Sequence, residues 1–165
     1  MISQKLINLI EQHADELTRR LMKDLLTREE TKHYRNLPED RVYERVHDVY
    51  SRLDLWLSRD KAKTNIRKHY TELGRQRYRE GIPCHEVMMA FMLIKKHLWL
   101  YIVENQIIDS SYECQRALEL NNRVILFFDR VIFFSAMGYE EERAKQEKVL
   151  DRGGFLSRIF KSRKV

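Results

Sequence analysis

The amino-acid sequence predicts an all-α protein, a helical bundle of about five to six helices with a long C-terminal helix and a short amphipathic tail. Apolar residues recur every three or four positions through most of the chain, which is the spacing of helices with one buried face. No segment shows the strict alternation of a half-buried strand. Only five glycines and two prolines occur among 165 residues, too few for the many turns of an all-β protein.

The first helix is expected from about Ser3, a residue that can cap a helix N-terminus, to about Thr27. Its apolar stripe consists of Leu6, Ile10, Ala14, Leu17, Leu21 and Leu25. A polar connection over residues 28–37 leads to Pro38, which favours the first turn of a second helix. The buried face of that helix comprises Val42, Val46, Val49, Leu53 and Trp56.

A third helix, the most polar one, is expected from near Asp60 to about Glu80. Gly81 can adopt the left-handed conformation that ends it, and Pro83 presets φ for the first turn of the next helix. The fourth helix, residues 84–104, is apolar almost all round, so we expect it at the centre of the fold. A fifth helix begins near residues 110–111 and continues beyond Phe134.

The chain changes in character after residue 138. Residues 1–138 are expected to form the helical domain and residues 139–152 a charged helical extension that projects from it. Residues 153–165 would form a tail tethered by Gly153 and Gly154, which are expected to end the helix. The net charge is +6, most of it in the last fifteen residues, so the body is nearly balanced. The absence of a basic helix face argues against a nucleic-acid partner.

The tail combines apolar and basic residues within a few helical turns. Its apolar residues, which would share one face of a helix, are Phe155, Leu156, Ile159 and Phe160. Its bases are Arg158, Lys161, Arg163 and Lys164. This pattern is typical of a weak membrane-surface helix or of a peptide that docks in a partner's groove. A frayed or folded-back tail is the third alternative.

The sequence shows neither a signal peptide nor an apolar run long enough to span a bilayer. We therefore expect a cytoplasmic protein. If the tail binds lipid, the protein would be peripheral at the inner face of the membrane.

The segment around the Gly81–Pro83 corner resembles a known family. The residues that carry the resemblance are Leu73, Gly74, Arg77, Gly81, Pro83, Glu86 and Val87. The pattern is similar to that of the N-terminal sensor domain of RsbR-type co-antagonists of the bacterial stressosome. This resemblance implies a globin-like helical fold without haem and a non-enzymatic, often dimeric input module that signals through protein contacts. The residues that follow do not resemble the STAS output domain of that family, so the signalling partner is unknown.

The sequence contains no recognisable catalytic or metal-binding constellation. His85 and Glu86 open a motif like that of zinc peptidases, but Met89 replaces its second histidine. We therefore expect a sensor or adaptor that is not an enzyme and that needs neither a metal nor a cofactor. The alternative is a haem- or small-ligand-binding sensor, with His69 or His97 as the candidate ligand.

The two cysteines are expected to be reduced, buried thiols, because their spacing fits neither a zinc site nor a disulfide framework. Cys84 is also a candidate redox thiol. It lies in the first turn after Pro83, and a helix N-terminus lowers the pKa of a thiol.

Two pairs of adjacent phenylalanines occur in the fifth helix. They are Phe127 with Phe128 and Phe133 with Phe134. Neighbours on a helix diverge by about 100°, so the four rings cannot all face one core. We expect some of them to form the face of a homodimer, with a pocket for a small ligand as the alternative.

Overall fold

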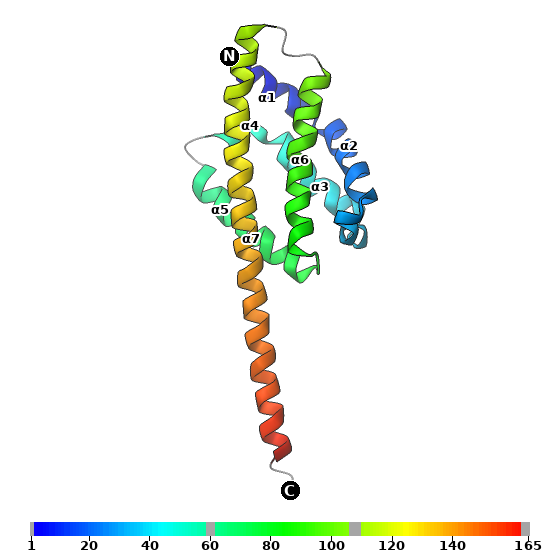
Figure 1. Cartoon of the computed structure of the whole chain (residues 1–165), viewed down its shortest axis with the longest axis vertical. Coiled ribbons are helices and arrows are strands. Elements are labelled where there is room, and N and C mark those ends of the chain that lie inside the picture. Colours follow the sequence, from blue (N-terminus) through cyan, green and yellow to red (C-terminus); the bar gives the residue numbers. More distant parts are fainter. Residues whose placement is uncertain (1, 59–61, 106–109, 163–165) are drawn as a thin grey trace.

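The computed structural model describes the backbone of residues 2–58, 62–105 and 110–162, and the side chains of residues 4–58, 65–105 and 110–150. These residues form helices and no strand, so the predicted all-α class is confirmed (Figure 1). Seven α-helices and one 3-10 helix are described. In chain order they are α1 (Ile2–Gln12), α2 (Ala14–Thr27), η1 (Glu29–Asn36), α3 (Glu39–Ser51), α4 (Leu53–Leu57), α5 (Ala62–Arg79), α6 (Cys84–Glu104) and α7 (Ser111–Ser162).

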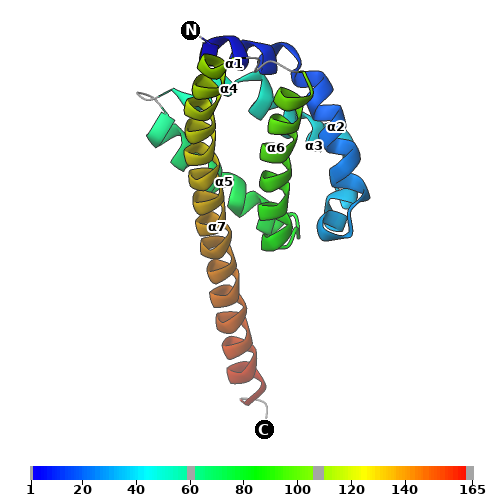
Figure 2. The same cartoon turned by 45° about the horizontal axis from the view of Figure 1, so that its top comes forward.

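Two of the predicted helices are each broken into two. The backbone bends at His13, between α1 and α2, and at Arg52, between α3 and α4, where φ is −126°. Figure 2 shows α1 lying across the end of α7, whereas α2 packs along α3 and α6. The break at His13 lets two stretches of one apolar stripe face different neighbours.

The corner between α5 and α6 forms as predicted. Gly81 is left-handed, with φ of +72°, and α6 begins directly after Pro83 and ends at Glu104. The N–H of Gly81 donates to the carbonyl of Tyr78, and the N–H of Ile82 donates to that of Arg77. These bonds satisfy carbonyls that the end of α5 would otherwise leave unpaired.

The long C-terminal helix is confirmed, and it is longer than predicted. Helix α7 comprises 52 residues and extends well beyond the rest of the bundle (Figure 1). It continues through Gly153 and Gly154, so the predicted helix end at these glycines is wrong. Glycine inside a helix costs only about 1 kcal/mol relative to alanine, which flanking helix-forming residues can offset. The tail side chains lie outside the described residues, and the predictions for them stay predictions.

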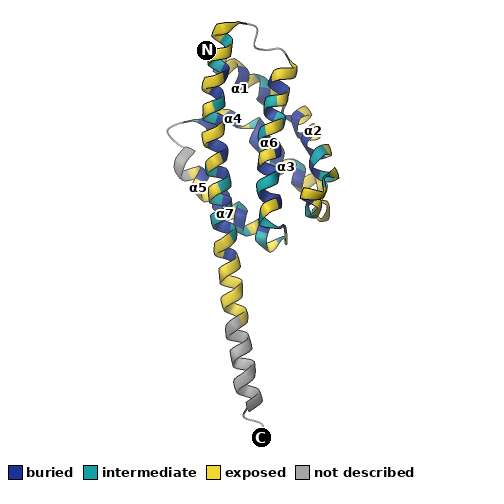
Figure 3. Ribbon diagram, viewed as in Figure 1, coloured by how far each residue is buried: buried dark blue, intermediate teal, exposed yellow. Residues whose placement is uncertain are grey.

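Among the described residues, helices α5 and α7 cross in very close contact. A Cβ atom on Gly74 would lie 1.9 Å from the carbonyl oxygen of Ser135, and one on Gly138 would lie 1.9 Å from that of Thr71. The two backbones therefore touch at this point, which only glycine permits. Buried residues run along the inner sides of all the long helices, and exposed residues dominate α7 beyond the bundle (Figure 3).

No helix among the described residues is long and apolar enough to cross a membrane.

Candidate functional site

A cleft of about 690 Å³ opens between α3 and α4 on one side and α5 on the other. Its inner surface comes from α2, η1 and α6, including Leu25, Tyr34 and Phe91. Clefts of this size with mostly apolar linings are typical of small-molecule sites. Arg77 marks one end of the cleft and Tyr70 the other, and further polar residues that line it include Glu44, Asp48, Lys68, Glu72 and Gln76.

At the first end, Arg45 and Arg77 bind one carboxylate, that of Glu80, and the more exposed Arg41 lies 3.8 Å from it. Arg77 has 4% of its surface exposed, and its Nη1 donates to Glu80 Oε2 at 2.7 Å. Arg45 donates to both oxygens of Glu80, at 2.7 and 3.1 Å. Burial raises the pKa of Glu80, but the two arginines outweigh this effect and leave that pKa below its usual value. The cluster of Arg45, Arg77 and Glu80 thus holds one positive charge in excess.

Tyr34 lies beside this cluster. Burial raises the pKa of its phenol to about 12, although the nearby Arg77 acts to lower it. The hydroxyl therefore stays protonated at neutral pH and can donate a hydrogen bond.

At the second end, aromatic rings surround Tyr70. Its ring centroid lies 5.6 Å from that of Trp56 and 4.9 Å from that of His69. Within the described part of the chain, neither the Tyr70 hydroxyl nor Trp56 Nε1 has a hydrogen-bond partner. Burial raises the pKa of Tyr70 and lowers that of His69. A neutral imidazole and two unsatisfied donors therefore line this end.

The residues that carry the family resemblance build the frame around the cleft. Leu73 lines the cleft, and Gly74 contacts α7 on the other side of α5. Glu86, which is 1% exposed, accepts the backbone N–H of His33 at 3.0 Å and lies 2.6 Å from His33 Nδ1. It thereby ties the start of α6 to η1. Val87 is buried in the core.

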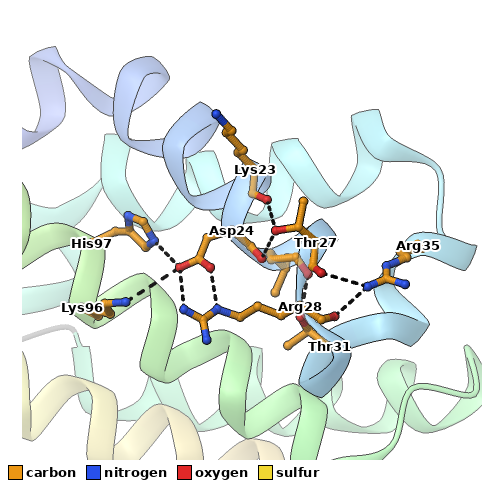
Figure 4. Close-up of polar contacts among 9 residues, drawn as sticks. Lys23, Asp24, Thr27, Arg28, Thr31, Arg35, Lys96 and His97 are labelled. Carbon is orange, nitrogen blue, oxygen red and sulfur yellow. Dashed lines mark hydrogen bonds and ion pairs between the residues drawn. The ribbon is translucent and has the colours of Figure 1, made fainter.

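The structure does not bring the two candidate haem ligands together. His69 lines the cleft, but His97 lies on the α2–α6 contact, where its Nε2 is 2.9 Å from Asp24 Oδ2 (Figure 4). The same carboxylate binds Arg28 and lies 3.9 Å from Lys96. Hydrogen bonds from Arg28 and, to a smaller extent, from His97 lower the pKa of Asp24 despite burial. His97 therefore joins two helices and does not reach the cleft.

Cys84 lies in the first turn of α6 after Pro83, as predicted, but the expected effect on its pKa is not found. Its thiol is half-buried, and burial raises its pKa, with the negative charge of Glu140 adding to the effect. The expected lowering by the helix N-terminus is therefore wrong in direction. Cys114 is exposed on α7 and is not the buried thiol expected. The described residues contain no group of three or more histidine, cysteine or acidic side chains that could hold a metal ion.

The four phenylalanines do not all face one core, as predicted, but two of the four candidates for a dimer face are buried. Phe127 and Phe128 are both buried, because α7 is covered on one side by α5 and on another by α1, α4 and α6. Phe134 is half-buried, and Phe133 is 62% exposed. Only Phe133 thus lies clearly on an outer face. Three further exposed apolar residues of α7 were not predicted from the sequence: Leu118, Ile125 and Leu126. Their seven-residue spacings, 118 to 125 and 126 to 133, were the available signal.

Residues 15–152 match the family model of the RsbT co-antagonist protein rsbRD N-terminal domain. No curated protein and no solved structure matches the chain. The match covers most of the sequence and includes the cleft, the α5–α6 corner and the α5–α7 crossing. This chain therefore belongs to the family of the RsbT co-antagonist rsbRD N-terminal domain, a family of stress-signalling modules.

Proposed function

We propose that this domain is a non-enzymatic sensor that passes the state of its cleft to α7 through α5. The observation that carries the proposal is the double role of α5. One side of it lines the cleft with Tyr70, Leu73 and Arg77, and the other side contacts α7 through Thr71 and Gly74. Any shift of α5 that follows a change in the cleft must therefore displace or loosen α7 as well.

The contact between α5 and α7 is close but contains few fixed polar bonds near its centre. Thr71 Oγ1 and Ser135 Oγ are buried there without a hydrogen-bond partner within the described residues. Two ion pairs follow toward the extension. Arg75 Nη2 lies 2.6 Å from Glu141, and Arg79 Nε lies 2.9 Å from Glu142. A small shift of α5 would change these pairs where α7 leaves the bundle, so we propose that α7 carries the output.

We further propose that the domain is a homodimer that associates through the outer faces of α6 and α7. These faces expose Leu118, Leu126 and Phe133 on α7 and Met92, Leu100 and Val103 on α6. Exposed positions are visible on both helices from one viewpoint (Figure 3). A second copy of the chain is the economical partner, because a large exposed apolar patch on a monomer favours association.

Hydrogen exchange along α7 tests the coupling. Gln76 lies exposed at the cleft, and a Gln76→Trp variant would place an indole at the cleft mouth. We expect it to change the exchange rates of α7 amides between residues 131 and 150. The matched control is Arg67→Trp, at an exposed position of α5 outside the cleft lining. Equal effects of the two variants on α7 would contradict the proposal.

A further inference from the structure

The two ends of the cleft lie on one face of α5 and at a fixed spacing. Tyr70 and Arg77 are seven residues apart, so they face nearly the same direction and are separated by about 10 Å along the helix axis. Leu73 lies between them and presents an apolar side chain to the same cleft. A ligand that contacts both ends must therefore be polar at two points and apolar in between.

The Arg77 end favours an anion. Arg45 and Arg77 both bind the carboxylate of Glu80, and Arg77 is almost completely buried. Glu44, Asp48 and Glu72 also line the cleft, but Asp48 pairs with Arg52, and Glu72 pairs with Arg75 and Arg79. The positive charge of Arg45 and Arg77 beyond that of Glu80 is therefore a local excess, which a bound anion would compensate. Guanidinium groups bind carboxylates through paired hydrogen bonds, and Arg77 has N–H groups beyond the one bound to Glu80. A carboxylate is thus the head group that fits this end.

The Tyr70 end favours an oxygen acceptor. The Tyr70 hydroxyl and Trp56 Nε1 are donors on residues that are 1% and 6% exposed, and both lack a partner among the described residues. Buried donors are nearly always hydrogen-bonded in native proteins, and Trp56 Nε1 is a buried donor without a partner among the described residues. The Tyr70 hydroxyl is not one of these fully buried atoms and can donate into the cleft, so the two donors together point to an occupant that accepts from them. The surrounding aromatic rings leave space for apolar groups next to that oxygen.

We propose that the cleft binds an apolar carboxylic acid that carries a second oxygen about 10 Å from its carboxylate. The carboxylate lies against Arg45 and Arg77, the aliphatic part passes Leu73, and the second oxygen accepts from Tyr70 and Trp56. This assignment rests on the proposed sensor function and names the class of molecule that the sensor detects. An aliphatic hydroxy acid is the simplest compound that meets all three requirements.

Three probes separate these requirements. They are 10-hydroxydecanoate, which spans the required distance with a bend in its chain, decanoate, which lacks the second oxygen, and 1,10-decanediol, which lacks the carboxylate. The chain has two tryptophans, so a Trp99→Phe variant leaves Trp56 as the only tryptophan, inside the cleft. We expect 10-hydroxydecanoate to change its fluorescence and to bind about two- to tenfold more tightly than decanoate, as for one added hydrogen bond. The diol should bind most weakly.

Two substitutions test which group of the ligand binds at each end of the cleft. Tyr70→Phe removes only the unpartnered hydroxyl. It should reduce the affinity for 10-hydroxydecanoate to that for decanoate and leave the affinity for decanoate unchanged. Arg45→Gln should weaken both acids about tenfold and leave the diol unchanged, and Arg45→Lys should recover part of the loss. These variants avoid Arg77, whose burial makes its replacement a threat to folding.

Light scattering on the same samples separates this proposal from the proposed function. A dimer in which none of the probes affects Trp56 overturns the ligand assignment alone. The assignment is also overturned if the diol binds as tightly as the acids, or if Tyr70→Phe leaves the preference for 10-hydroxydecanoate intact. A protein that binds the acid but is monomeric supports the ligand and overturns the proposed dimer.

Discussion

Each residue of the family pattern has a structural role that its own chemistry explains. Gly81 supplies a left-handed turn, Glu86 fixes the 3-10 helix η1, and Gly74 allows two helices to touch. The roles of Gly81 and Pro83 could be predicted from the sequence, because turn chemistry is local. The role of Gly138 could not, because its neighbour is Thr71, 67 positions away in the chain. The pairing of His97 with Asp24 could not be predicted either, because these two residues also lie far apart in the chain.

The α5–α7 crossing predicts a large effect of Gly138→Ala. The added methyl group would meet the carbonyl oxygen of Thr71, so the helices must separate. Overpacking of this kind costs about 1–3 kcal/mol, which exceeds the gain in helix propensity from alanine. We expect the free energy of unfolding in urea to fall by about 2 kcal/mol. Gly81→Ala has open space around it, and it should cost only the strain of a left-handed alanine, about 1 kcal/mol. A Gly138→Ala protein as stable as wild type would contradict the close crossing.

The lowered pKa of Glu80 predicts that the protein loses stability in acid. Its pKa in the folded protein lies below the usual value of 4.5, since Arg45 and Arg77 outweigh burial. A carboxyl group with a lowered folded pKa contributes stability above its unfolded pKa and loses it as the pH falls through the folded pKa. We expect the free energy of unfolding to decrease as the pH falls below about 4.5, and to decrease less steeply in Glu80→Gln. Parallel pH profiles for the two proteins would exclude Glu80 as a source of the acid sensitivity.

Among the secondary-structure elements, the sequence predicted helix positions better than helix continuity. The approximate bounds predicted for α6, residues 84 and 104, are confirmed, because Pro83 and the apolar stretch define them. The breaks at His13 and Arg52 were not, because the apolar spacing continues through both positions. The direction in which each half must turn depends on neighbouring helices that sequence spacing does not reveal. Likewise, Phe127 and Phe128 are both buried because α7 is covered from two sides.

The ion pairs between α5 and α7 predict local protection of the extension. Glu142 is nearly buried against Arg79, so Glu142→Gln should loosen α7 where it leaves the bundle. We expect amides of residues 139–150 to exchange about two- to fivefold faster, the range for single partly exposed ion pairs. Arg143→Gln is the matched control, since Arg143 pairs only with Glu140 and Glu147 of its own helix among the described residues. Comparable acceleration in this control would show that the α5 contact does not hold the extension.

For the whole molecule, the exposed faces of α6 and α7 predict a dimer. Leu126→Glu combined with Phe133→Glu would introduce four charges into a symmetric interface, and we expect light scattering to show a shift from dimer to monomer at micromolar concentration. Leu55→Glu changes an equally apolar exposed residue on α4 and should leave the dimer intact. If the Leu55→Glu protein dissociates and the double variant does not, the interface lies elsewhere.

The most direct test of the sensor account is the distance between the two copies of α7 in the dimer. A nitroxide at Val149→Cys, an exposed site on the extension, would be measured by pulsed electron paramagnetic resonance with Cys84 and Cys114 replaced by serine. We expect a defined distance that changes when Gln76→Trp occupies the mouth of the cleft and stays unchanged in Arg67→Trp. The same distance distribution in all three proteins, or no dipolar coupling in any, would contradict the account.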